Sequence, residues 1–294
     1  MLGKIARQLR VTTRRSEMAW RYGYHLPQVL RYRLRAEAGQ SSEVRRVIDE
    51  LDREGVVQTS AEALLSSPES FQALRDEVVK IQRDRTADLV EARRQGNLGG
   101  LKSYSYEFFG GLQNASPIHR EFACQPEFKQ VADGYLGLGS RLRAADTWLT
   151  LVSNAEARQS QTWHRDPEDR YVVKVFALLS DVDDRSGPFH YARGSHMKGT
   201  DKRVKACAKY GLTDEEMNSL VPRKRWFIGT GGVGTIVFAD TRGYHKGGLA
   251  RERERGMTHE RVVLFADGRV RRLGISLHPG LGRAIEAHES TCSA

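Results

Sequence analysis

The stretch Trp163-His164-Arg165-Asp166-Pro167 decides how this chain is interpreted. In a β-strand, side chains two positions apart project from the same face, so an extended backbone would present His164 and Asp166 together. In a helix these two side chains would diverge by about 200°. The surrounding sequence is typical of strands, so we expect one imidazole and one carboxylate to face a common space.

A second histidine can complete this pair. His245 lies in Tyr244-His245-Lys246-Gly247-Gly248, after a strand predicted over residues 235–239 and a turn. Two histidines and one carboxylate occupy one face of an octahedral metal ion and leave three positions open, as in non-heme Fe(II) oxygenases. An isolated His-x-Asp pattern is more often a hydrogen-bonded or surface pair, so the interpretation depends on the sequence context. We predict that His164, Asp166 and His245 bind one metal ion.

The second half of the chain predicts a β-rich domain. Short apolar runs separated by glycine-rich turns suit a sandwich or jelly roll rather than repeated β-α-β units. A helical insert is predicted over residues 204–220, with Thr213 and Glu216 as a capping box. The predicted strands are residues 148–152, 162–166, 171–179, 189–192, 235–239, 261–265 and 270–277.

The first half predicts helices and two short strands. Residues 1–40 are interpreted as a basic helical extension, and residues 41–294 as a single domain whose N-terminal part, 41–100, is helical. Serine followed by proline is typical of a helix start, and glycine of a helix end. We expect helices from Ser42 to before Gly55, from Ser67-Pro68 to Gly96, and from Ser116-Pro117 to about Gly134 or Ser140, with strands at residues 56–57 and 102–109.

Composition narrows the class of protein. The 294 residues are 39% hydrophobic and 29% charged, which suits a folded core. No apolar run approaches the roughly 18–20 residues of a membrane span. The three cysteines, Cys124, Cys207 and Cys292, are far apart and fit neither a disulfide scaffold nor a CxxC zinc module. A cytoplasmic location is the expectation.

Positive charge is concentrated near the N-terminus. The chain carries a net charge of +10, and residues 1–50 contain eleven Lys/Arg against five Asp/Glu. A basic arm can contact phosphate, nucleic acid or an anionic membrane, whereas a solvated helical face is the commoner explanation. Leu2, Ile5 and Leu9 recur at helical spacing among basic residues, as in a weak interfacial helix. We expect no nucleic-acid partner.

Two further motifs extend the pattern. The strand predicted to end near Leu179 leads through Asp181-Val182 and the turn Gly187-Pro188 to the tripeptide Gly194-Ser195-His196. With the His-x-Asp motif and the distal His245, this order resembles the phytanoyl-CoA dioxygenase superfamily of Fe(II)/2-oxoglutarate-dependent oxygenases. The resemblance covers roughly residues 45–280 and is most specific at 161–196 and 235–265. We interpret His196 as structural.

The resemblance implies a fold and a chemistry. The fold is mainly β with flanking helices (α+β), around a double-stranded β-helix, the jelly roll of cupin-like proteins. His164, Asp166 and His245 would bind Fe(II), with 2-oxoglutarate as cosubstrate and O₂ as oxidant, giving succinate and CO₂. Because Asp166 is present, hydroxylation of a small molecule is expected, although desaturation or cyclisation uses the same chemistry. The excess positive charge makes an anionic substrate reasonable.

The resemblance also requires an arginine for the distal carboxylate of 2-oxoglutarate, since a guanidinium pairs a carboxylate bidentately. Arg255 has the usual spacing from His245, but it follows a run of alternating Arg and Glu that is typical of a solvated loop. Arg261 opens the predicted strand 261–265, so we prefer Arg261. Lys102 is a second candidate contact, although a surface lysine is the ordinary interpretation. Gly247 departs from the family pattern, which often has a hydroxyl residue there.

Two other classes of function remain open. A cupin with the same three ligands could hold zinc or manganese and act as a hydrolase or isomerase, because affinity alone does not select iron. A basic protein that binds nucleic acid or a membrane surface would not need the three ligands. The substrate and the oligomeric state do not follow from the sequence.

Overall fold

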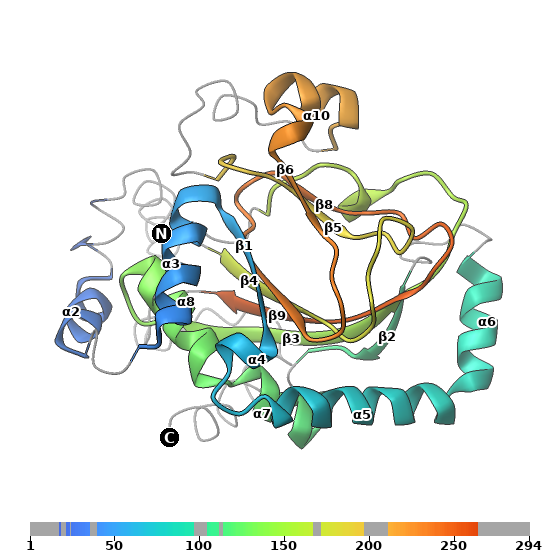
Figure 1. Cartoon of the computed structure of the whole chain (residues 1–294), viewed down its shortest axis with the longest axis horizontal. Coiled ribbons are helices and arrows are strands. Elements are labelled where there is room, and N and C mark those ends of the chain that lie inside the picture. The colour runs from blue at the N-terminus through green and yellow to red at the C-terminus, as the bar shows by residue number, and fades with distance from the viewer. Residues whose placement is uncertain are drawn as a thin grey trace, which may run out of the picture.

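A computed structural model describes residues 18, 22–23, 25–35, 40–96, 105–111, 114–166, 172–196 and 211–263. Helices lie against two antiparallel sheets, so the architecture is α+β (Figure 1). Several sequence-based predictions lie outside these residues. They are the interfacial helix with Leu2, Ile5 and Leu9, Lys102 and the start of its strand, residues 204–210 of the helical insert, the end of the strand 261–265, and the strand over 270–277.

The two sheets pair only antiparallel strands among the described residues. The order in the large sheet is β1-β7-β4-β9-β3-β2, and in the small sheet β6-β5-β8. The large sheet comprises β1 (Val56–Ser60), β2 (Ser105–Phe109), β3 (Arg141–Thr150), β4 (Val172–Leu178), β7 (Thr235–Asp240) and β9 (Arg255–Val263). The small sheet comprises β5 (Phe189–Ala192), β6 (Trp226–Gly229) and β8 (His245–Gly247).

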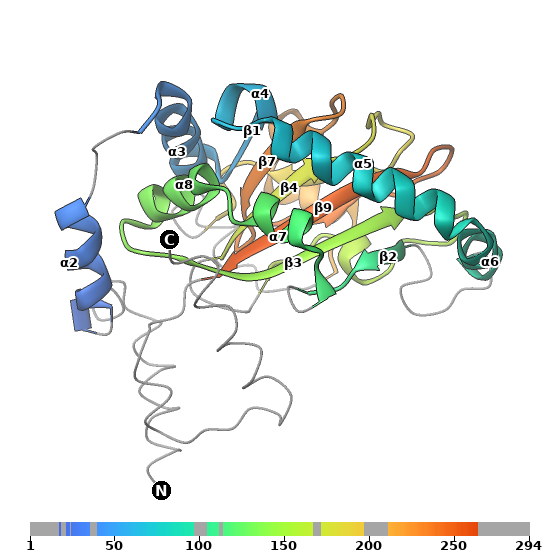
Figure 2. The ribbon, with the colours of Figure 1, turned by 90° about the horizontal axis from the view of Figure 1, so that it is seen from below.

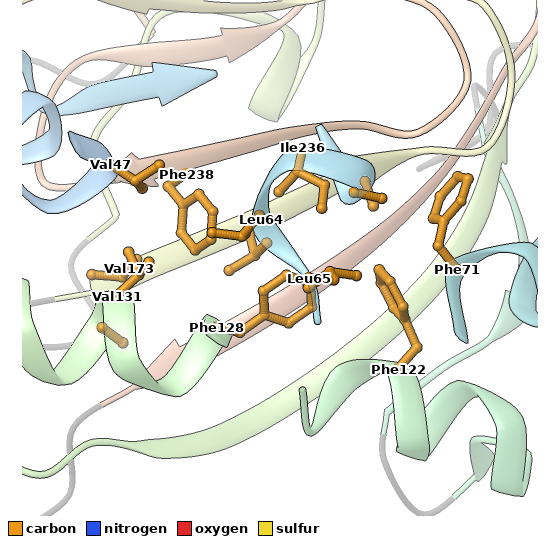
Figure 3. Close-up of a cluster of buried hydrophobic side chains, with 14 of the residues drawn as sticks. Val47, Leu64, Leu65, Phe71, Phe122, Phe128, Val131, Val173, Ile236 and Phe238 are labelled. Atoms are coloured by element: carbon orange, nitrogen blue, oxygen red, sulfur yellow. The ribbon is translucent and has the colours of Figure 1, made fainter. Parts of the chain in front are cut away.

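The helices cover one face of the large sheet, as Figure 2 shows for α3, α5, α7 and α8. Phe71, Phe122 and Phe128 from these helices form a row of neighbouring rings that ends at Phe238 of β7 (Figure 3). The Phe128 and Phe238 ring centroids lie 6.0 Å apart. Burying each such ring contributes about 1.5–3 kcal/mol. The helices are α2 (Leu26–Arg35), α3 (Ser42–Glu54), α4 (Ala61–Leu64), α5 (Glu69–Asp84), α6 (Thr86–Gly96), α7 (Pro117–Ala123), α8 (Pro126–Leu136) and α10 (Asp214–Leu220).

Strand β4 separates the helical core from the space between the sheets. Val173, Val175 and Ala177 belong to the core under the helices. Phe176 and Leu178, which alternate with them, pack instead with side chains of the small sheet. The space between the two sheets is therefore lined by the alternate face of the same strand, and the predicted metal ligands lie there.

Helix α3 ends at a position that only glycine can occupy. Gly55 has φ +79° and ends the helix by donating its N–H to the Leu51 carbonyl. A Cβ at Gly55 would overlap the Tyr191 hydroxyl and lie 2.6 Å from His196 Nδ1. Both the backbone conformation and the close approach of the small sheet thus require glycine here.

Two long predicted helices are each divided in the structure. The segment from Ser67-Pro68 to Gly96 forms α5 and α6, which break at Arg85 and turn sharply (Figure 1). Helix α5 begins at Glu69 without a side-chain cap. The segment after Ser116 forms α7 and α8, because Pro126 lacks the N–H that would continue a helix. Ser116 caps α7 as predicted, whereas the cap of α3 is Ser41 rather than Ser42.

Two strand predictions need correction. Residues 162–166 form no strand: Trp163 and His164 each make one isolated bridge, to Leu212 and His245. Strand β9 begins at Arg255, six residues before the predicted start, because Arg255 pairs with Thr150 of β3. The charged residues before it suggested a loop, but tertiary pairing overrides that local signal.

Phe189–Ala192 is β5, and the Thr213–Glu216 capping box begins α10, both as predicted. Strand β3 begins at Arg141, seven residues before the predicted start at Trp148. Strands β6 and β8 and the short helix α4 were not predicted. Cys124 is disulfide-bonded, contrary to the expectation from the spacing of the cysteines. No helix in the described ranges combines the length and the apolar character needed to cross a bilayer.

We expect the stability of the fold to fall in acid through His119 of α7. Burial lowers the pKa of His119 to about 4, so the unfolded chain, with the ordinary value of 6.5, binds its proton first as pH falls. The contribution of His119 is fully present above about pH 6.5 and is lost toward pH 4, by roughly 2–3 kcal/mol. Urea unfolding of wild type and His119→Gln at about pH 7 and pH 4.5 measures this. Equal losses in the two proteins would contradict it.

Candidate metal centre

Two histidines far apart in the sequence are joined through their backbones. The N–H of each of His164 and His245 donates to the carbonyl of the other, and both N···O distances are 3.0 Å. Two residues further on, the Asp166 N–H donates to the Thr241 carbonyl at 2.9 Å. These three bonds bring the predicted ligands together without a continuous strand at residues 162–166.

Both imidazoles are held in the same tautomer. His164 Nδ1 lies 2.9 Å from the Thr162 carbonyl, and His245 Nδ1 lies 2.9 Å from the Gly243 carbonyl. A carbonyl oxygen only accepts, so each Nδ1 carries the hydrogen and each Nε2 has a lone pair. Such a bond at one ring nitrogen is the usual means of orienting a metal-binding histidine.

The two Nε2 atoms converge on the carboxylate of Asp166. The distances are 3.8 Å from His164 Nε2 to Asp166 Oδ1 and 3.5 Å from His245 Nε2 to Asp166 Oδ2. One ligand atom from each residue lies within 4.8 Å of the others. Neighbouring ligands of one ion, each about 2.1 Å from it, stand roughly 3 Å apart, so small side-chain shifts would close the set on a metal. The donor set fits a divalent metal ion.

Lys174 supplies a positive charge next to this carboxylate. The Lys174 ammonium forms an ion pair with Asp166 Oδ2, and both side chains are largely buried. Burial opposes ionisation of Asp166, but His245 and Lys174 outweigh it, so the pKa of Asp166 lies well below its usual range. Burial lowers the pKa of His245 to about 3, so the imidazole is neutral at pH 7 and Lys174 is the cation that remains. The Asp166 carboxylate and the neutral His245 imidazole are thus in the forms that bind metal.

A buried ion pair holds the turn before His245. Asp240 is fully buried, and its carboxylate accepts from Arg242 Nε at 2.9 Å and from the Tyr135 hydroxyl at 2.5 Å. Burial raises the pKa of Asp240, but Arg242 outweighs this and keeps it below the usual value. The pair fixes the backbone on either side of Thr241, whose carbonyl accepts from Asp166.

The tripeptide Gly194-Ser195-His196 connects this turn to helix α3. Ser195 Oγ accepts from the Tyr244 N–H at 2.7 Å, and His196 Nε2 bonds the Asp52 carbonyl at 3.1 Å. Gly194 has φ +74° and donates its N–H to the Glu54 carbonyl. The observed role of His196 is therefore to bind the last carbonyls of α3.

Arg255 is a buried cation, and no described residue gives it an anionic partner. It is 4% exposed, and its guanidinium donates to the Gly187 carbonyl and to Thr150 Oγ1. Its Nε is buried without a partner, and within the described residues no carboxylate lies within 4 Å. Burial lowers its pKa to about 10. An uncompensated buried guanidinium is costly and is the group that a carboxylate ligand would satisfy.

For Arg261 and Lys102, unlike Arg255, the structure does not describe the side chain. Arg261 lies in β9, where its backbone pairs with Ala144 of β3 and Lys174 of β4. The Arg261 side chain and the whole of Lys102 lie outside the described residues. The argument that favoured Arg261, its place on a strand, applies equally to Arg255, because both lie in β9. The preference for Arg261 therefore loses its basis.

Sequence reasoning missed three residues that shape this centre. Lys174 interrupts the apolar run 172–178, and a charged residue in such a run is a detectable signal of a buried ion pair. Asp240 and Arg242 carry no comparable signal, because i, i+2 charge pairs are common in turns.

No protein-family model matches the sequence, and a search of curated proteins finds no match. Among solved structures, the chain is similar to EctD from S. alaskensis with 2-oxoglutarate and 5-hydroxyectoine, with a TM-score of 0.52 and 17% identity over 77% of each chain. It is also similar to the non-heme alpha-ketoglutarate-dependent epimerase SnoN from nogalamycin biosynthesis, with a TM-score of 0.49 and 17% identity over 76% of this chain and 83% of that one. For AviO1 from Streptomyces viridochromogenes Tue57 the TM-score is 0.48, with 17% identity over 77% and 97%. At these identities the likeness concerns the fold.

Removing the Lys174 ammonium should destabilise the metal-free protein. Lys174→Met leaves the Asp166 carboxylate buried without its cation, which costs roughly 3–5 kcal/mol. A divalent metal replaces the lost charge, so Co(II) should raise the Tm of the variant more than that of wild type. Thermal unfolding with and without Co(II) measures both effects. The control is Lys246→Met, whose partner Asp214 is partly exposed, so a smaller loss is expected. Equal metal-free Tm values for Lys174→Met and wild type would refute the role.

Proposed function

We propose that this protein is an Fe(II)- and 2-oxoglutarate-dependent oxygenase that oxidises a small molecule. The observation that carries the proposal is the convergence of His164 Nε2, His245 Nε2 and the Asp166 carboxylate, with both Nδ1 atoms already bonded to carbonyls. Two histidines and one carboxylate are the ligand set of this enzyme class.

The likeness to EctD supports the finer description of the fold. We propose that the two facing antiparallel sheets are the halves of a double-stranded β-helix, and that the chain is a distant relative of the phytanoyl-CoA dioxygenase superfamily. In such a jelly roll, ligands bind between the sheets. Phe176 and Phe189, whose ring centroids lie 4.7 Å apart, contribute an apolar wall from each sheet.

We further propose Arg255, ahead of Arg261, as the residue that binds the distal carboxylate of 2-oxoglutarate. Its spacing from His245 suits the resemblance, and its guanidinium is buried without an anion. Bidentate pairing would satisfy the buried Nε and neutralise the charge. A contact from Lys102 stays a prediction.

The residues divide the work as follows. When bound, Fe(II) with O₂ and 2-oxoglutarate supplies the oxidising power, and 2-oxoglutarate is converted to succinate and CO₂. His164 and His245 hold the metal through Nε2, and Asp166 contributes the negative charge. Lys174 keeps Asp166 ionised and oriented, and Arg255 orients the cosubstrate. Phe176 and Phe189 exclude water from the space between the sheets. Because Asp166 is retained, hydroxylation is the proposed outcome.

The proposal predicts succinate formation that depends on all three ligands. Wild type should convert 2-oxoglutarate to succinate with Fe(II) and O₂, even slowly without a primary substrate, whereas His164→Ala, Asp166→Ala and His245→Ala should lose at least about 100-fold. Anaerobic Fe(II) titration should show the same loss of binding, with circular dichroism confirming the fold. Wild-type turnover with zinc alone and without 2-oxoglutarate would instead favour a hydrolase or isomerase.

Arg255→Met should raise the 2-oxoglutarate concentration for half-maximal succinate formation by about 100-fold, since losing a buried charge pair costs 2–5 kcal/mol. Fe(II) binding should be unchanged, and thermal stability should not fall, because the variant removes an unpaired buried charge. The matched control is Arg261→Met. If Arg261→Met shows the cosubstrate defect and Arg255→Met does not, the assignment moves to Arg261.

A further inference from the structure

The exposed large hydrophobic side chains are concentrated near the N-terminus. Eight are strongly exposed among the described residues, and five of these lie between residues 18 and 34. The five recur at every fourth position: Met18, Tyr22, Leu26, Leu30 and Leu34. Leu26, Leu30 and Leu34 all lie in helix α2 at spacings of four residues, so these three form a stripe rather than scattered single residues.

Helix α2 carries Leu26, Leu30 and Leu34 on an exposed side. His25 and Val29 are buried, and Val29 belongs to the main core. At about 100° per residue, the centre of the stripe formed by Leu26, Leu30 and Leu34 lies roughly 120° around the helix from these buried residues. The exposed fraction of the side chain rises along the stripe, from 40% at Leu26 to 49% at Leu30 and 86% at Leu34. The helix is thus anchored on one side and apolar on another.

The charge of this segment selects the kind of surface that would cover it. Residues 18–35 contain four arginines and no acidic residue. Helix position 33 falls beside the leucine stripe, and the Arg33 side chain is exposed. An apolar stripe in an arginine-rich segment is the pattern of helices that lie in a bilayer interface, with leucines among the acyl chains and guanidinium groups at the anionic headgroups.

We infer that the face of α2 formed by Leu26, Leu30 and Leu34 is a docking surface for an anionic phospholipid bilayer. Because Val29 packs into the core, the helix would hold the folded domain against the membrane rather than through a free tail. Leucine burial and headgroup attraction act together, so binding should require both the stripe and anionic lipid. This inference is independent of the proposed enzyme activity.

Vesicle flotation of the full-length protein tests the inference. Vesicles with about 30% phosphatidylserine should bind at least about tenfold more protein than phosphatidylcholine vesicles, and about 0.5 M NaCl should reduce the binding. The double variant Leu30→Gln/Leu34→Gln should lose this binding by about tenfold or more and keep its fold, since both side chains are exposed. The matched control is Ile228→Gln/Val233→Gln, which removes two exposed apolar side chains elsewhere and should bind as wild type does.

Three results would overturn the inference. The first is equal binding of wild type to both kinds of vesicle, and the second is undiminished binding of the Leu30→Gln/Leu34→Gln variant. The third is a wild-type dimer in sedimentation velocity without lipid that the same variant converts to a monomer, because the stripe would then be an interface between two copies. A monomeric wild type that binds only the anionic vesicles supports it.

Discussion

The candidate site depends on the pair of backbone hydrogen bonds between His164 and His245. This one bridge fixes two short segments to each other. One is residues 162–166, which form no regular strand, and the other is β8, which has only three residues. Everything around it serves to keep the two backbones in register. The Asp240–Arg242 pair shapes the turn, and Ser195 binds the same turn from the side. The imidazoles are then oriented by their own backbone carbonyls, so the geometry is set before any ligand arrives.

Burial makes the charges of this region strongly interdependent. Asp166 and Lys174 compensate each other, as do Asp240 and Arg242, because a lone charge in the interior is costly. Arg255 breaks this rule among the described residues. Natural folds tolerate such an unsatisfied group where binding later repays its cost, which is why an exception of this kind points to a ligand.

Much of the fold and the three candidate ligands could be predicted from the sequence because their signals are local. Alternating apolar residues predicted β4 and β5, and Thr213 with Glu216 predicted the start of α10. The start of β9 could not be predicted, because Arg255 is strand-like only through its pairing with Thr150. The cap of α3 could not be assigned because Ser41 and Ser42 are adjacent and equally suited to cap a helix. Lys174 was detectable, but its partner was defined only by the three-dimensional arrangement.

Gly55 has a consequence for the order in which this protein folds. The Gly55 carbonyl accepts from Asp240, and the space above its Cα is occupied by Tyr191 and His196. Three elements therefore meet at Gly55, where there is no room for a Cβ atom. They are the end of α3, strand β5 in the middle of the small sheet, and the turn before His245. Contacts of such wide sequence separation form late, since the intervening chain must first be ordered. The three candidate metal ligands should accordingly come together only after most of the chain has left the ribosome, and no short fragment around residues 163–166 would retain their arrangement.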